Sequence, residues 1–263
     1  MGDTTEIAWT DHTFNPWWGC AKVSPACNNC YAENLAIRTG HDVWGKNADR
    51  RKLSERHWRR PLVWAKQAHA AGRPSLVFCA SMADVFEDRP DVADERDDLF
   101  ELIQETGDHL IWQLLTKRPE NISRMVPGDW IDGIEEWSGF WPEHVWIGTT
   151  VEDQRRANER IPQLLEVDSE REDPAVRFLS CEPLLEELDL TPWLDSVDWV
   201  ICGGESGPGH RPLDLDHARS LRDQCEAFGV PFFFKQVGGH TAKAGGDLLD
   251  SVEWKQFPKA AGR

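Results

Sequence analysis

Short apolar runs that alternate with helix-like stretches are the feature that most restricts the fold of this 263-residue chain. Each run is rich in β-branched, aromatic or leucine residues and is too short to be a buried helix. Glycine and proline bound several of these runs, as they bound strands. The pattern predicts strands at residues 5–10, 75–80, 109–116, 144–151, 176–181, 199–204 and 230–236. It predicts helical segments at 32–71, 95–106, 154–166 and 215–228.

Strands separated by helices indicate parallel pairing, because a helical crossover returns the chain to the same edge of the sheet. Seven such units predict an α/β fold, with a full or partial (β/α) barrel of six to seven parallel strands. A doubly wound open sheet is the alternative, since the pattern does not determine closure. We expect one domain over residues 1–263, with a loop at 15–33 and a basic helical insertion at about 41–70.

Polar and charged residues follow the carboxyl end of the expected strands. Barrels and open α/β sheets both place their active sites at this edge. A guanidinium or ammonium here suits a ligand carboxylate or phosphate, whereas an ion pair at the rim is the alternative. For each carboxylate the alternative is a solvated rim or a helix cap, and for the glycines it is a plain turn. The candidate ligand-binding residues are Ser81, Asp84, Lys117, Arg118, Thr150, Glu152, Glu182, Gly203, Gly204 and Glu205.

The loop at residues 15–33 holds Cys20, Cys27 and Cys30 in the spacing C-x6-C-x2-C. Three converging thiolates repel one another unless a cation lies between them. Three ligands instead of four leave a coordination position open, as in a catalytic metal site or an iron–sulfur site. The alternative is a zinc site that a histidine closes, for which the candidates are His12 and His41. The other four cysteines lie in expected strands or a helix, where packing in the core is the favoured interpretation.

The chain resembles the radical S-adenosylmethionine (radical SAM) superfamily, and more narrowly a phage-associated three-cysteine-motif family of uncharacterised proteins. The likeness extends over the segments WWGCAKVSPACNNCYAE, LLTKRP, WIGTTVED, FLSCEPLL, VICGGESGPGHRP and FFFKQVGG. The superfamily most often spaces its cysteines C-x3-C-x2-C, and the first gap here is longer. The resemblance implies that Cys20, Cys27 and Cys30 hold three irons of a [4Fe–4S] cluster.

In that resemblance SAM occupies the fourth iron and lies against the strand-end residues named above. An external one-electron donor reduces the cluster, and SAM is cleaved to a 5′-deoxyadenosyl radical that abstracts hydrogen from substrate. We expect a radical SAM isomerase or lyase that acts on a DNA base or on a hypermodified thymine side chain. A DNA-base repair lyase of the spore-photoproduct-lyase type is the nearest alternative.

One basic region interrupts an acidic chain whose net charge is −17. This charge opposes long-range attraction to nucleic acid, so any contact must be local. Basic side chains with interleaved tryptophans suit phosphate contact and base stacking. A solvated helix that pairs with acidic surface is the alternative. The candidate nucleic-acid contacts are Arg51, Lys52, Arg56, Arg59 and Arg60.

Two functions from other classes also fit the sequence. One is a non-catalytic, zinc-stabilised nucleic-acid-binding module, and the other is a metal-assisted hydrolase that uses the strand-end carboxylates. Seven cysteines, an odd number, argue against a disulfide framework. The chain shows neither an apolar run of membrane-spanning length nor a signal peptide. We therefore expect a cytoplasmic protein, in a host cell if phage-encoded, with no membrane partner.

Overall fold

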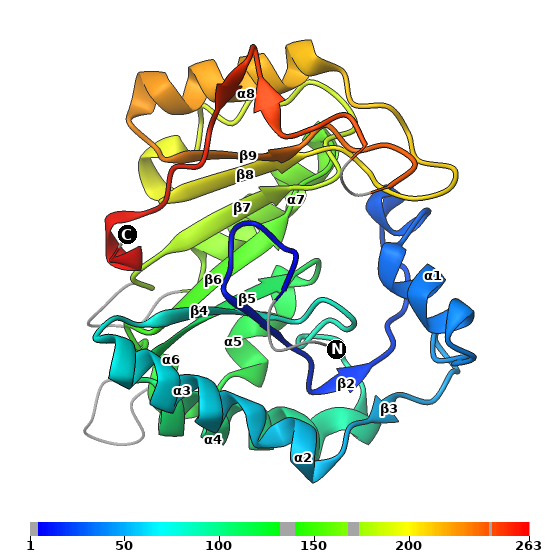
Figure 1. Ribbon diagram of the computed structural model, residues 1–263, viewed down its shortest axis with the longest axis vertical. Coiled ribbons are helices and arrows are strands. Elements are labelled where there is room, and N and C mark those ends of the chain that lie inside the picture. The colour runs from blue at the N-terminus through cyan, green and yellow to red at the C-terminus, as the bar shows by residue number, and fades with distance from the viewer. Residues whose placement is uncertain (1–4, 132–139, 168–173, 242–243, 263) are drawn as a thin grey trace.

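Seven parallel strands form one curled sheet, a half-barrel, in a computed structural model that describes residues 5–131, 140–167, 174–241 and 244–262 (Figure 1). The strand order is β1-β4-β5-β6-β7-β8-β9, so each strand pairs with the strand of this sheet that follows it in the sequence. Strands β2 and β3 form a separate sheet. A doubly wound sheet reverses this order at a switch point, and this sheet does not. The prediction of a partial (β/α) barrel is therefore confirmed, with β1 and β9 as its two edges.

The strands of this sheet are β1 (His12–Phe14), β4 (Ser75–Cys79), β5 (Leu110–Thr116), β6 (Val145–Thr150), β7 (Arg177–Cys181), β8 (Trp199–Gly203) and β9 (Phe232–Gln236). The longer helices are α1 (Tyr31–Arg38), α3 (Arg60–Ala71), α4 (Ala93–Thr106), α7 (Gln154–Leu165) and α8 (Leu215–Phe228). Short helices are α2 (Glu55–Trp58), α5 (Ile122–Met125) and α6 (Gly128–Ile131). Two small antiparallel pairs join β2 (Trp17–Trp18) to β3 (Arg51–Lys52) and β10 (Leu248–Leu249) to β11 (Val252–Glu253). The 3₁₀ helices are η1 (Pro25–Cys27), η2 (Pro90–Val92), η3 (Pro119–Asn121), η4 (Leu194–Ser196) and η5 (Lys259–Ala261).

The first strand is the one strand that the sequence misplaces. Pairing with β4 starts where the Asp11 carboxylate accepts a hydrogen bond from the Leu76 amide at 2.8 Å, so β1 follows the expected range 5–10. Trp9 turns inward and packs on Phe78, with ring centroids 4.6 Å apart. Burial of the indole thus takes the place of strand pairing at these residues.

The region 32–71 is not one helical stretch, which corrects the expected helical insertion. Left-handed glycines at Gly40 and Gly45 interrupt it after α1, and helix resumes only at α2. A positive φ is strained for other residues, so these glycines end regular helix there.

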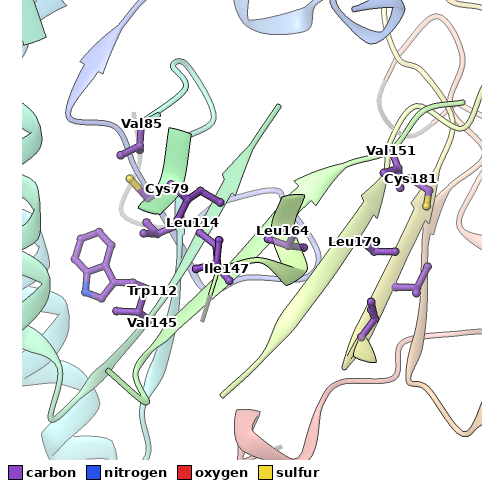
Figure 2. Close-up of a cluster of buried hydrophobic side chains, with 14 of the residues drawn as sticks. Cys79, Val85, Trp112, Leu114, Val145, Ile147, Val151, Leu164, Leu179 and Cys181 are labelled. Carbon is purple, nitrogen blue, oxygen red and sulfur yellow. The ribbon is translucent and has the colours of Figure 1, made fainter. Parts of the chain in front are cut away.

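The outer face of the sheet carries the main hydrophobic core beneath α3, α4, α7 and α8. Alternate residues along each strand point to this face, as Leu114, Ile147 and Leu179 do toward Leu164 of α7 (Figure 2). The strand cysteines Cys79, Cys181 and Cys202 and the helix residue Cys225 are fully buried. The prediction that these four cysteines serve packing is confirmed.

The concave face of the sheet is closed by an aromatic cluster. Its buried members are Trp9, Phe78, Trp146, Phe178, Trp199 and Phe233. Most of them lie in the amino-terminal halves of their strands. The same alternation then brings Thr150, Ser180, Gly203 and Lys235 onto the concave face at the carboxyl edge. One end of the half-barrel is therefore apolar and filled, and the other is polar. In the described part of the chain, no helix has the length and apolar character needed to span a membrane.

Candidate functional site

The cysteine loop, residues 15–33, follows β1 and runs across the carboxyl edge of the sheet. It contains β2 and η1, and α1 begins at Tyr31, one residue before the helical region expected from residue 32. Its side chains and backbone bind residues that follow β4, β5, β6 and β8. The sequence correctly placed this loop at the edge where the strand-end residues gather.

Arg118, directly after β5, holds the first cysteine of the loop. Its Nη1 lies 2.7 Å from Asp84 Oδ2 and 3.7 Å from Cys20 Sγ, and its Nη2 donates to the Ala21 carbonyl at 2.8 Å. Burial raises the pKa of Asp84, but Arg118 and the Thr116 hydroxyl outweigh it and leave that pKa below its usual value. Arg118 is thus a buried ion-pair partner that ties the loop to two strands.

A second anchor at the same place escaped the sequence reading. Glu87 accepts a hydrogen bond from the Ala21 amide at 2.9 Å and forms a bidentate ion pair with Arg50. Both side chains are buried. Arg50 also donates to the Val43 and Gly45 carbonyls, which fixes the segment before β3. Arg50 directly precedes the basic candidates Arg51 and Lys52, and its pairing with a residue far along the chain leaves no local signal.

Glu152, after β6, anchors the middle of the loop. It is fully buried, accepts from the Ala26 amide at 3.2 Å, and pairs with Arg160 of α7 at 2.8 Å. Burial raises the pKa of Glu152, but Arg160, Ser24, Lys117 and the Ala26 amide together outweigh it and leave that pKa below its usual value. Thr150, at the end of β6, is buried, and its carbonyl accepts from the same guanidinium at 2.7 Å.

Glu205, after β8, anchors the last part of the loop. It accepts from the Asn29 side-chain amide at 2.8 Å and from the Arg211 backbone amide at 2.8 Å. The Arg211 guanidinium also pairs with Glu205 and donates to the Pro25 carbonyl at 3.0 Å. Three of the four candidate carboxylates, Asp84, Glu152 and Glu205, are therefore engaged by the loop or by its supporting arginines.

Glu182 is the exception among the four. It makes an ion pair with Lys235 of β9 at 2.7 Å, and both side chains keep some exposure. A Cβ at Gly203 would lie 3.3 Å from Glu182 Oε2, so glycine leaves room for this carboxylate. The pair lies on the concave face at the carboxyl edge, beside Ser180, whose hydroxyl is 3.4 Å away. Glu182 and Lys235 are therefore charged side chains at this edge that a ligand can reach.

Three candidate ligand-binding residues remain, Ser81, Gly204 and Lys117, and each lies in different surroundings. The Ser81 carbonyl accepts from the Tyr31 hydroxyl at 2.9 Å, at the foot of α1. A Cβ at Gly204 would lie 1.9 Å from the Val237 carbonyl oxygen. That glycine therefore serves close packing of two chain segments, and not the expected approach of a ligand. Lys117 is partly exposed and lines a cleft outside the loop.

The three thiols share one edge of the sheet but are not gathered around a common centre. Within the described ranges, no three His, Cys, Asp or Glu side chains form a group that could hold a metal ion. Burial raises the pKa of the Cys20 thiol to about 12 and also raises that of Cys30. Cys30 caps α1, and Cys27 ends η1. As a donor set, three thiolates on one loop suit an iron–sulfur cluster.

The histidines of the zinc alternative have other surroundings. His12 stacks flat on Trp64, with ring centroids 4.4 Å apart. His41 lies edge-on to Trp18 at 5.6 Å. Each of the two imidazole rings thus packs against an indole, and neither belongs to a metal-binding group in the described residues.

The basic run is divided between two helices and the residue that joins them. Arg56 lies in α2, Arg60 starts α3 and Arg59 is the junction, so these residues share no continuous helix face. Arg59 pairs loosely with Glu55 at 3.7 Å. Trp64 is buried in the core, because α3 packs its apolar face on the sheet. That indole is consequently unable to stack on a base, which corrects the expectation for it.

The other basic candidates lie near β3. Arg51 rests over the Trp18 ring at 4.8 Å, and Lys52 pairs with Glu95 at 2.5 Å. Both are exposed. Water weakens such contacts at exposed cations, so both side chains can exchange partners.

A family model described as "Protein of unknown function (DUF5131)" matches residues 4–258. The match includes the cysteine loop, all seven strands of the half-barrel and every strand-end residue described above. No curated protein and no solved structure matches the chain.

Proposed function

The chain belongs to the DUF5131 family, and we propose that it is a radical SAM enzyme with a [4Fe–4S] cluster on Cys20, Cys27 and Cys30. One observation carries the proposal. The three-cysteine loop lies across the carboxyl edge of a parallel half-barrel, held there by buried ion pairs. This is the edge at which barrel enzymes perform their chemistry. The proposed substrate is a DNA base or a hypermodified thymine side chain, which the enzyme isomerises or cleaves.

When bound, the cluster supplies the electron that cleaves SAM, and an external donor replaces that electron. The protein's own residues hold and shield the site. Arg118, Glu152 and Glu205 fix the loop at three points along its length. The aromatic cluster fills the amino-terminal part of the concave face, which leaves the polar residues at the carboxyl edge.

Glu182 is the residue that we propose contacts SAM, through the ribose hydroxyls or the ammonium. Lys235 orients its carboxylate at 2.7 Å, and Gly203 leaves space beside it. Thr150 and Ser180 lie on the same face by strand alternation. A partly buried carboxylate that pairs with one lysine, and lies at 3.4 Å from one hydroxyl, keeps acceptor positions for a ligand.

Glu182→Gln is expected to weaken SAM binding by at least about tenfold, since a charge-assisted hydrogen bond contributes about 1.5–3 kcal/mol. Equilibrium dialysis of SAM against anaerobically reconstituted protein measures this. The matched control is Glu159→Gln, which removes an exposed carboxylate on α7. Equal SAM affinity for wild type and Glu182→Gln would exclude Glu182 from the SAM site.

Anaerobic reconstitution with iron and sulfide tests the activity itself. We expect about four irons and four sulfides per chain, because three thiolates and SAM complete one cubane. Reduction in the presence of SAM should release 5′-deoxyadenosine, measured by chromatography. A protein that instead takes up one zinc per chain and leaves SAM intact would support the zinc-stabilised module and end this proposal.

A further inference from the structure

A cleft of about 740 Å³ opens outside the cysteine loop, between residues 21–23 of the loop and α7. The segments after β4 and β5, residues 87–89 and 117–121, form its other walls. Clefts that enclose whole small molecules have volumes of roughly 300–1,000 Å³. The volume of this cleft lies in that range and is larger than a single ion would occupy. It lies at the carboxyl edge of the sheet, beside the candidate site.

The lining of this cleft is rich in cations, although the chain as a whole is strongly acidic. Eight lysine and arginine side chains line it, against four carboxylates. The net charge of the chain is −17. A polyanion is repelled by the surface at large and attracted locally here. Such a contrast restricts anion binding to one place.

Several of these cations remain available to a ligand. Lys46 and Lys117 form no ion pair within 4 Å in the part of the chain that the structure describes. Arg155 pairs with Glu159 on the exposed surface of α7, and such a pair is worth little in water. Arg118 and Arg160, by contrast, are held by buried carboxylates and build the wall.

The cleft is extended along α7. Its lining runs from Arg155 to Gln163, which is roughly 12 Å of helix at 1.5 Å per residue. Phosphate groups on one strand of nucleic acid repeat at several ångströms, so more than one fits this length. A flat anionic membrane would instead be repelled by a chain whose net charge is −17.

We propose that this cleft binds the phosphodiester backbone of a DNA strand. Ala21 and Arg118 belong both to its wall and to the contacts around Cys20. A strand in the cleft therefore passes directly beside the first cysteine of the loop. The basic run at residues 51–60 contributes no lining residue. This inference rests on DNA as the proposed substrate, but it concerns binding, which needs neither cluster nor SAM.

The test compares two variants with the same change in net charge. Lys46→Glu/Lys117→Glu reverses two cations in the cleft, and Arg56→Glu/Arg59→Glu reverses two exposed cations outside it. Fluorescence anisotropy of a labelled single-stranded DNA oligonucleotide is followed over a salt series, with full-length protein before and after reconstitution. Thermal unfolding of each variant confirms that it is folded.

The cleft variant is expected to bind at least tenfold more weakly, with a salt slope smaller by about 1.4, because each lost phosphate contact changes it by about 0.7. The control variant should keep the wild-type slope. Equal slopes for the two variants, or no binding by wild type, would overturn the proposal. Complete competition by millimolar inorganic phosphate or thymidine monophosphate would also overturn it, in favour of a small phosphate ligand. If the reconstituted protein binds DNA as expected but fails to cleave SAM, the proposed function is wrong and the proposed DNA-binding cleft is still supported.

Discussion

Replacement of any one of Cys20, Cys27 and Cys30 by serine is expected to abolish both cluster assembly and SAM cleavage. A neutral hydroxyl is a poor ligand for iron, and a site with three protein ligands has none to spare. Iron and sulfide content per chain, measured after anaerobic reconstitution, should fall to background in all three variants. Release of 5′-deoxyadenosine should fall with it.

The control for this series is Cys225→Ala, in the buried face of α8. It removes a thiol from the hydrophobic core and should keep both iron content and SAM cleavage. The test is the contrast between the three loop-cysteine variants and this core-cysteine variant. If Cys27→Ser retained the cluster while Cys225→Ala lost it, the ligand assignment would be wrong. If all four variants cleaved SAM alike, the radical SAM proposal itself would fall.

Arg118→Met is expected to lower the free energy of unfolding by about 3–5 kcal/mol. The change leaves the buried Asp84 carboxylate without its closest cation, and Glu87 loses a neighbour 3.6 Å away. The loop also loses the bonds from this guanidinium to Cys20 and Ala21. Urea unfolding at neutral pH measures the difference.

The choice of neutral pH follows from the lowered pKa of Asp84. A carboxyl whose pKa is lower in the folded state contributes stability above its unfolded pKa. That contribution disappears as the pH falls through the folded pKa. Neutral solution therefore contains the whole effect, and the cost of Arg118→Met should shrink in strong acid.

Arg155→Met is the matched control, since it breaks an exposed arginine–glutamate pair on α7. Its expected cost is small compared with that of Arg118→Met, because solvent screens an exposed pair. A second variant, Arg118→Met with Asp84→Leu, removes both buried partners and should recover part of the lost stability. If Arg118→Met cost no more than Arg155→Met, the buried ion pair would not be an anchor of the loop.

The parts of the fold that depend on local pattern were predictable. Strands β4 to β9 were located within about two residues, because a strand buried on both faces reads as a short apolar run. The half-barrel order follows from the repeated strand–helix unit. The position of β1 was wrong for two reasons. A strand of three residues is too short to show a clear apolar alternation. The apolar residue Trp9 is buried by side-chain packing and does not lie in a strand.

The composition of the candidate site was predictable only in part. The cysteine loop was found because three cysteines within eleven residues form a local signal. The strand-end carboxylates were found by position, but their partners were not. Glu152 and Glu205 bind the loop 126 and 176 residues away in sequence, and no periodicity encodes such a pairing.

The sequence by itself therefore determined strands β4 to β9, the helices α4, α7 and α8, and the edge at which the three cysteines lie. Each of these follows from residues that are near neighbours along the chain. Only the tertiary structure decided which charges support the loop and which remain for a ligand. A carboxylate at the end of a strand is chemically the same residue in both roles. Its role depends on the groups that reach it from distant parts of the chain. Arg118 ties Asp84 to the loop, whereas Glu182 pairs with Lys235 and keeps some exposure.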